Sequence, residues 1–488
     1  MKTFRLRYVL AMFALCLSVT PPASAGKPTK TVRAAFDADP KWDSFRSRLL
    51  PEALPQVRQE FGYRTSQNAG GESAGEIGGT IQRSRRRASY AKVISPKTLD
   101  DALSASGKLS VTRAGGGSGV MFGWFNQNSR GWRTPNSLAF RLDGNGGKYW
   151  MFYEYGTKNW RTAGLGAFDG LRYQTTKTKP FAADGTVHDW SLKYDPEGNA
   201  GAGLVTFRVD RRTYELPLRP GHKQEGATFD RFGIWNVQVS GNSMDAYFDD
   251  LTINGEREDF GRDPAWRGEQ NDALYEERVV RPYHDFGFSD TNHAGGKPGE
   301  IGGNIFRDER PAYYAANTGA LSLETSLTAS GRIAFRNAGS DSGIKIGWFD
   351  SQSKRTKNTP EHEQPEKNYL GVTIEGPSRV GHYFRASYGD SSGSGGAPTA
   401  DPRTGAERPL IKPDGAIHRW KLEYSPQAAD GNGRLSVTLD GKTHTLNLRP
   451  EDRARGASFD RFGLFNIQSG GHHVEVYLDD VSHTASAE

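Results

Sequence analysis

The chain has 488 residues, which is enough for two or three domains that each bury a core of their own. Glycine is abundant at 59 residues, aromatic residues make up 11%, and methionine is scarce at 5, a composition that favours strands over helices. The formal net charge is only +6, and Lys2, Arg5 and Arg7 supply half of it, so the charge gives no case for nucleic acid as a partner.

The N-terminus has the form of a secretory signal peptide. An apolar run at residues 8–19 follows the basic residues, and Ala23-Ser24-Ala25 precedes Gly26 as a small-residue cleavage site. We therefore expect a signal peptide at residues 1–25 and a secreted mature protein, either extracellular or periplasmic. No later apolar run reaches the ~20 residues of a membrane helix. The only cysteine, Cys16, lies inside the signal, so the mature chain forms no disulfide, which together with the signal points to a bacterial source.

The rest of the sequence is one unit written twice. FDRFGIWNVQ from Phe229 returns as FDRFGLFNIQ from Phe459, and FDADPKW from Phe36 returns as FGRDPAW from Phe260. The blocks GEIGG, SGVMFGWF and DGTVHDW recur in the same order, at a spacing of about 225 residues. We predict two tandem domains, at residues 36–255 and 260–484, joined so closely that they reorient little.

Alternating hydrophobicity predicts the strands within each repeat. Val120, Phe122 and Trp124 correspond to Ile344, Ile346 and Trp348 in the second repeat, so we place both sets in the core. Each repeat offers about ten to twelve short strands and no amphipathic helix of useful length. The predicted fold class is therefore all-β, with two tandem antiparallel β-sandwiches of jelly-roll type.

One stretch is densely basic. It holds Arg83, Arg85, Arg86 and Arg87, where the second repeat has a mixed Arg307-Asp308-Glu309-Arg310. We interpret the stretch as a solvated loop, with the docking of an acidic polymer as the alternative.

The end of each repeat carries two adjacent carboxylates. In YFDDLTI, alternation gives Asp249 the same side as Leu251 and Ile253, so we expect it to point toward the edge of the core. Asp479 repeats the position. A buried carboxylate is costly unless it is paired or bound to a metal ion.

This closing strand resembles that of the concanavalin A-like lectin and glucanase superfamily, which includes laminin-G-like and carbohydrate-binding modules. The resemblance implies one structural Ca²⁺ per repeat, with Asp249 and Asp479 as ligands and Glu76 and Glu300 of the GEIGG blocks as their partners. The alternative is an ion pair with an arginine such as Arg83 or Arg307.

A second set of residues is expected on an exposed, concave sheet. Sugars stack on aromatic rings there and bond to charged groups through their hydroxyls. Strand alternation and the following loop place these candidates on that face: Phe125, Arg141, Asp143, Trp150, Phe152, Glu154 and Trp160 in the first repeat, and Phe349, Glu375, Tyr383 and Arg385 in the second.

The motifs of common catalytic sites are missing from the sequence. A Glu-x-Asp-x-x-Glu run of sandwich glycosidases does not occur, although Asp143 and Glu154 could meet across adjacent strands as an acid pair. We predict a secreted polysaccharide-binding protein without catalytic activity, in which two linked sites gain avidity. The alternatives are a glycoside hydrolase or polysaccharide lyase that acts through the concave face of the first repeat, and a structural or adhesive surface protein.

Overall fold

The computed structural model describes residues 28–132, 134–159, 161–167, 180–339, 341–353, 366–376, 382–396, 409–469 and 471–487. These residues form strands β1 to β34 and two short helices, α1 (His222–Glu225) and α2 (Pro450–Arg455), which confirms the all-β prediction. No helix in these ranges is long and apolar enough to cross a membrane. The predicted signal peptide and Trp160 lie outside the described residues.

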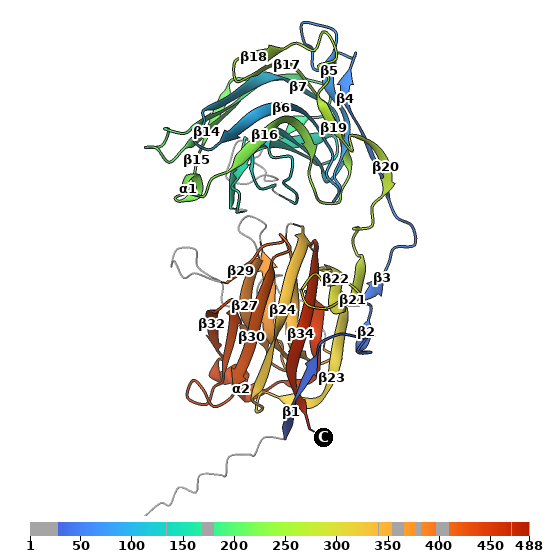
Figure 1. Ribbon diagram of the computed structural model, residues 1–488, viewed down its shortest axis with the longest axis vertical. Coiled ribbons are helices and arrows are strands. Elements are labelled where there is room, and N and C mark those ends of the chain that lie inside the picture. Colours follow the sequence, from blue (N-terminus) through green and yellow to red (C-terminus); the bar gives the residue numbers. More distant parts are fainter. Residues whose placement is uncertain are drawn as a thin grey trace, which may run out of the picture.

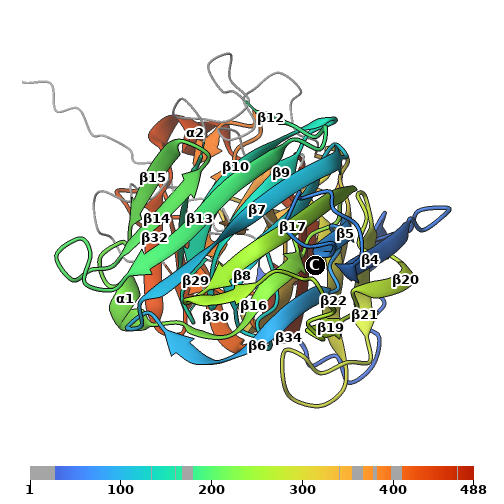
Figure 2. The same ribbon diagram turned by 90° about the horizontal axis from the view of Figure 1, so that it is seen from above.

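Four antiparallel sheets make up two sandwiches. The front sheet of the first sandwich has the order β11 (Thr162–Gly166), β10 (Lys148–Gly156), β9 (Ser137–Gly144), β8 (Ser118–Phe125), β16 (Thr228–Asn236), β6 (Ser89–Thr98) and β19 (Arg267–Glu269), with β12 (Phe181–Ala182) on β10. Its back sheet has the order β15 (Arg212–Pro217), β14 (Leu204–Val209), β13 (Val187–Asp195), β7 (Leu103–Ala114), β17 (Ser243–Ile253), β5 (Glu76–Gln82), β4 (Gln56–Arg64) and β20 (Asp272–Glu276), with β18 (Glu256–Glu258) on β17. Figure 2 shows the back-sheet strands β14, β13, β7 and β17 side by side.

The second sandwich repeats this arrangement. Its front sheet has the order β2 (Asp43–Phe45), β23 (Tyr313–Ser322), β33 (Ser458–Asn466), β25 (Ser342–Phe349), β26 (Tyr369–Gly376), β27 (His382–Gly389) and β28 (Gly395–Gly396), with β29 (Leu410–Ile411) on β27. Its back sheet has the order β3 (Arg48–Leu49), β21 (His284–Ser289), β22 (Glu300–Phe306), β34 (His473–Ser486), β24 (Leu327–Ala338), β30 (Ile417–Ser425), β31 (Arg434–Leu439) and β32 (Lys442–Asn447), with β1 (Thr29–Ala34) on β34.

A separate hydrophobic core fills each sandwich. In the first, Phe122 of the front sheet stacks on Phe248 of the back sheet, with ring centroids 3.9 Å apart. The predicted core residues Phe122 and Trp124, like Trp348 in the second core, are fully buried. Strand alternation therefore gave the correct inner face in both repeats.

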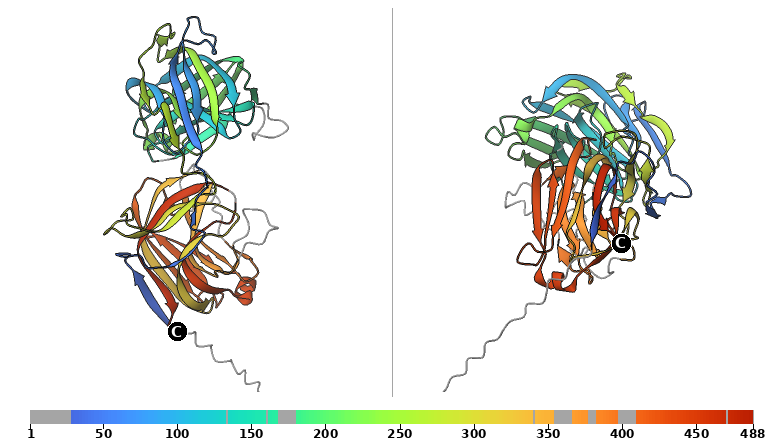
Figure 3. Two further views of the ribbon diagram at one scale, coloured as in Figure 1. Left: turned by 90° about the vertical axis from the view of Figure 1, so that its right-hand side faces the viewer. Right: turned by 60° about the horizontal axis from the view of Figure 1, so that its bottom comes forward.

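The segments that lead the two repeats are exchanged between the sandwiches. Strands β1, β2 and β3, in residues 28–49, pair with β34, β23 and β21 of the second sandwich. Strands β18, β19 and β20, in residues 256–276, pair with β17, β6 and β4 of the first. We call these segments the N-terminal arm and the middle arm; Figures 1 and 3 show the blue N-terminal arm beside the lower sandwich.

The exchange changes the expected domain limits. The sheets are built from residues 56–276 in one sandwich, and from residues 29–49 and 284–486 in the other, rather than from residues 36–255 and 260–484. The arms are equivalent structures, because left-handed backbone recurs at Phe36 and Phe260, with φ of 53° and 52°. Each arm therefore docks in the same way, and neither docks on the sandwich that comes directly after it in sequence.

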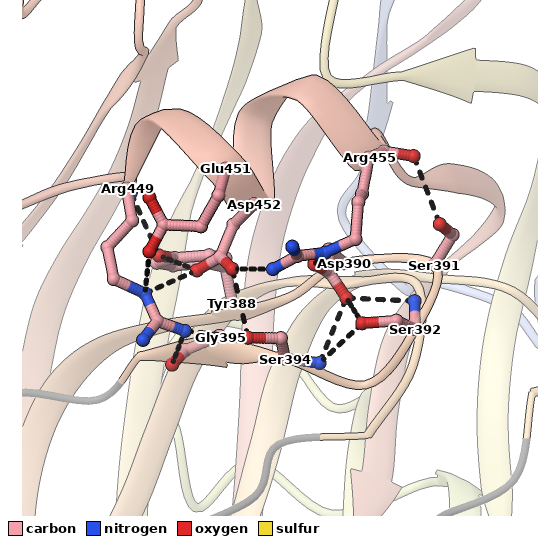
Figure 4. Close-up of polar contacts among 10 residues, drawn as sticks. All are labelled: Tyr388, Asp390, Ser391, Ser392, Ser394, Gly395, Arg449, Glu451, Asp452 and Arg455. Atoms are coloured by element: carbon pink, nitrogen blue, oxygen red, sulfur yellow. Dashed lines mark hydrogen bonds and ion pairs between the residues drawn. The ribbon is translucent and has the colours of Figure 1, made fainter.

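Short helices fix the ends of the front sheets. In the second sandwich, Tyr388 of β27 donates a hydrogen bond to Asp452 of α2 at 2.6 Å, and Arg455 binds both Asp390 and Asp452 (Figure 4). In the first, Tyr155 of β10 instead bonds to Nδ1 of His222 of α1 at 2.9 Å. The same strand end is thus anchored by a carboxylate in one repeat and by an imidazole in the other.

Candidate functional site

The outer face of the first front sheet collects most of the predicted ligand-binding residues. Strand pairing places Trp150 opposite Asp143 and Phe152 opposite Arg141 on adjacent strands β10 and β9. Alternation turns these side chains away from the core, because Tyr149, Met151 and Tyr153 of β10 belong to it. The prediction that they share one face is correct.

Arg141 is the centre of this group. Its guanidinium forms an ion pair with Asp143 and lies 3.6 Å from Oε1 of Glu154. It also lies over two aromatic rings, 4.5 Å from the centroid of Phe152 and 5.3 Å from that of Trp132. The carboxylates and the rings therefore meet around one cation.

The same residues are less exposed than strand alternation predicted. Arg141, Trp150 and Glu154 are each 3–4% exposed, and Phe125 is 1% exposed. Phe125 belongs to a hydrophobic cluster with Trp132 and Trp235, and the ring centroids of Phe125 and Trp235 lie 4.4 Å apart. The expectation of a fully exposed face is wrong here because side chains from beyond the strand ends fold over the sheet. Asp143 and Phe152 are half-buried.

The outer face of the second front sheet has a related group. Glu375, Tyr383 and Arg385 are half-buried, and Arg385 of β27 forms an ion pair with Glu375 of β26. Phe349 is 6% exposed, because it packs with Tyr369 and Phe465. The carboxylate position is kept from the first repeat, since Asp143 and Glu375 close equivalent strands, whereas the guanidinium comes from a different strand.

Two arginines that sequence reasoning did not place on these faces hold both carboxylates. Arg83 Nη2 lies 2.5 Å from Asp143, and Arg307 Nη1 lies 3.0 Å from Glu375. The available signal was their equivalence, because each follows a GEIGG block at the same spacing. Arg307 also lies 2.5 Å from Asp341.

The basic stretch is structural rather than a solvated loop. Arg87 is 4% exposed and pairs with Glu269 of the middle arm, and Arg85 pairs with Glu475 of the second sandwich. The cations therefore join the arm and the sandwiches.

The predicted metal ligands lie under a loop on the back sheets. Asp249 is fully buried, but not for the reason expected, because a β-bulge at Asp250, with φ of 48°, interrupts the alternation. Asp249 consequently shares the outer face with Tyr247, and Leu251 returns to the core. In the second repeat Asp480 has φ of 50° and Asp479 is 2% exposed.

Cations near these acids bind the second carboxylate of each pair. Lys108 lies 2.8 Å from Asp250, and Arg332 pairs with Asp480. The ion-pair alternative therefore holds for the neighbouring aspartates, with partners other than Arg83 and Arg307.

The glutamates do not fit the predicted Ca²⁺ site. Glu76 already accepts hydrogen bonds from Ser66, from the backbone and side chain of Asn68, and from the backbone of Ala69. Glu300 accepts equivalent bonds from Thr291, His293 and Ala294. Both carboxylates instead anchor the loop that precedes their strand.

Asp249 has one carboxylate oxygen that could face a cation. Among the described residues, its Oδ2 atom has no hydrogen-bond partner, and Oδ1 accepts the N–H of Asp250 at 2.7 Å. Burial raises the pKa of Asp249 to about 6, and burial also raises the pKa of Asp479. No cluster of three or more histidine, cysteine, aspartate or glutamate residues that could hold a metal ion occurs in the described ranges.

Comparisons with known proteins return similarity of fold alone. No protein-family model matches the chain, and no curated protein matches it. Domains LG4-5 of the mouse laminin alpha1 chain align over 88% of this chain and 92% of that one, at 14% identity and a TM-score of 0.25. The carbohydrate recognition domain of Emp47p aligns over 43% of this chain and 91% of its own, at 13% identity and a TM-score of 0.24. An alginate lyase from Alteromonas sp. 272 aligns over 47% and 94%, at 10% identity and a TM-score of 0.19. At these TM-scores the strand pairing, rather than any alignment, supports the two-sheet sandwich.

Proposed function

We propose that the protein is a secreted polysaccharide-binding protein that holds its ligand on the outer faces of the two front sheets without cleaving it. The observation that carries the proposal is the duplicated group on those faces. Each has a carboxylate fixed by an arginine, Asp143 by Arg83 and Glu375 by Arg307. A partly accessible ring lies in each group: Phe152 is opposite Arg141, the ion-pair partner of Asp143, and Tyr383 is opposite Glu375.

The chemistry of these groups suits a sugar chain. An aromatic ring offers a surface for the C–H face of a pyranose, and a fixed carboxylate or guanidinium bonds to its hydroxyls. Because a carboxylate already held by an arginine keeps its orientation, it loses little conformational entropy when a sugar binds. Two such faces on one chain would bind a polymer with avidity.

The arrangement of the two acids supports binding rather than hydrolysis. Glycoside hydrolysis needs two carboxyl groups with a sugar and a water molecule between them. Asp143 and Glu154 both contact the guanidinium of Arg141, so protein atoms occupy that position.

An adhesive role is the second candidate, and one observation favours it. Phe125 and Trp235 are buried in a cluster that also contains Val239. A Cβ atom at Gly339 of the second sandwich would lie 3.4 Å from Val239, so this cluster reaches the other sandwich. Aromatic rings buried between the repeats are what an adhesive role would require.

Retention of the mature protein on a panel of immobilised polysaccharides tests the proposal. We expect Phe152→Ala and Tyr383→Ala each to weaken retention at least about fivefold, the effect of losing one important contact residue. Tyr247→Ala is the matched control, because Tyr247 is a half-buried ring on the outer face of the back sheet. Equal retention of the wild type and the three variants would exclude the front faces as the binding site and favour adhesion to protein. Reducing ends or unsaturated sugars in the same wells, lost in Glu154→Gln, would show catalysis.

A further inference from the structure

A cleft of about 630 Å³ lies between the two sandwiches. Equivalent turns of the two repeats form its walls, with Gly241-Asn242 from the first and Gly471-His472 from the second. Gln82 and Phe306, which end the equivalent strands β5 and β22, also line it. The volume is in the range of sites that hold a small molecule or one part of a polymer.

Contacts between the sandwiches fix the walls of this cleft. Arg85 pairs with Glu475, and Ser240 donates a hydrogen bond to the carbonyl of Val279. Val279 belongs to residues 277–283, which link the middle arm to the second sandwich and which we call the crossing segment. Val279, Tyr283 and Phe306 form a small hydrophobic cluster beside the cleft. The cleft is therefore already formed before a ligand binds.

The lining has an apolar part and a polar part. Val57, Val280 and Phe306 supply apolar surface, and Asn242 and His472 supply polar groups. Burial, with Arg83 nearby, lowers the pKa of His472 to about 4. The imidazole is therefore neutral at pH 7 and both donates and accepts hydrogen bonds, as sugar hydroxyls require.

Two arginines, Arg83 and Arg281, and two carboxylates, Glu277 and Asp341, line the cleft. Asp341 is held by Arg307, and Glu277 accepts the backbone N–H groups of Arg85 and Val279. Arg281 is exposed at the cleft and forms no ion pair within the described part of the chain. Glu277 is buried and Asp341 is already paired, so Arg281 is the exposed charge of the lining that can pair with an acidic ligand.

We infer that this cleft binds an anionic sugar unit, whose acidic group pairs with Arg281 and whose ring contacts the apolar part of the lining. The inference rests on the proposed function, because the unit would belong to the same polysaccharide. Continuity with both front sheets supports it. Arg83 lines the cleft and binds Asp143, and Asp341 lines the cleft and binds Arg307. A polymer could therefore run from one front face through the cleft to the other.

Affinity measurements on the full mature chain test this inference with three polymers: polygalacturonate as the carboxylated one, dextran sulfate as the sulfated one, and dextran as the neutral one. We expect Arg281→Gln to weaken binding of an acidic polymer at least about tenfold, since hydrogen bonds between charged groups are strong. Arg281→Lys should recover part of the loss because it keeps the charge. Arg278→Gln is the matched control, because Arg278 is exposed in the same crossing segment but does not line the cleft.

The outcomes separate this inference from the proposed function. Binding of carboxylated but not sulfated polymer, or the reverse, identifies the acidic group. Equal losses in Arg281→Gln and Arg278→Gln would show general surface attraction and overturn the cleft site. Binding that depends on Phe152 and Tyr383 but not on Arg281 would overturn the cleft alone, and no binding to any polysaccharide would overturn both.

Discussion

Trp42 and His483 lie edge to face with their ring centroids 5.9 Å apart, although one belongs to the N-terminal arm and the other to the final strand. His483 also stacks on Phe462, at 4.7 Å and nearly parallel. Val32 of the same arm pairs with His483 in the β1–β34 ladder. The N-terminal arm is thus part of the second sandwich.

Removal of either arm tryptophan should weaken the sandwich on which that arm docks. We expect Trp42→Ala to cost the second sandwich about 3 kcal/mol, as for other large aromatic truncations. Trp266→Ala should cost the first sandwich a similar amount, because Trp266 packs on Phe260 and Tyr90. Hydrogen exchange checks this pair of variants: Trp42→Ala should speed exchange in β34, and Trp266→Ala in β6. If hydrogen exchange became faster instead in the sandwich that comes directly after the altered arm in sequence, the arms would not dock as described.

Acid should destabilise the second sandwich through His483. Burial lowers the pKa of His483 from 6.5 to about 4. Between these values the unfolded chain binds a proton and the folded chain does not. The free energy of unfolding therefore has its full value above pH 6.5 and decreases as the pH falls toward 4. His483→Ile, which copies Ile253 of the first repeat, should remove up to about 3 kcal/mol of this dependence. Urea unfolding at pH 7 and pH 4.5 measures it, and identical pH dependence in both proteins would refute the assignment.

Asp249 should give the first sandwich the opposite dependence. Its pKa rises from 3.8 in the unfolded chain to about 6. Between these values only the folded chain binds the proton, so stability grows as the pH falls from 6 to 4. Asp249→Asn carries no charge at any pH and should therefore be more stable than the wild type at pH 7, by up to about 3 kcal/mol. The same urea titration checks this. A variant less stable at pH 7, and insensitive to Ca²⁺ that stabilises the wild type, would show that a cation neutralises Asp249.

Glu76 should act as an anchor for its loop rather than as a metal ligand. In Glu76→Gln an amide NH₂ group faces some of the donors that now bind the carboxylate. We expect a loss of at least about 2 kcal/mol, equal with Ca²⁺ and with a chelator. Thermal unfolding under both conditions measures the difference. A loss seen only with Ca²⁺ would restore the predicted ligand role.

Local alternation explains what could be predicted from the sequence. Only the two-residue period of a strand is needed to place Phe122 and Trp348 in the core, and to place Arg141 and Phe152 together on the outer face. The position of Asp249 could not be counted in the same way, because the bulge at Asp250 shifts every later side chain. The burial of Trp150 depends on tertiary packing over the sheet, which strand period does not encode.

The exchange of the arms could not be predicted for a different reason. Both arms have the same FxxDPxW pattern, so the pattern does not tell which sandwich each arm joins. Contacts outside the pattern, such as Arg87 with Glu269 and Phe45 with Tyr313, differ between the two arms and appear only in the folded structure.

The β1–β34 ladder, together with the hydrogen bond from Ala487 to Pro28, also sets the order of events during synthesis. β1 leaves the ribosome before either sandwich exists, and its partner strand is made only after nearly all the other strands. The second sandwich consequently cannot close before β34 has been made, and contacts of such large sequence separation form slowly. The closure of the second sandwich is therefore delayed until β34 has been made, because the two strands of the β1–β34 ladder lie far apart in the sequence.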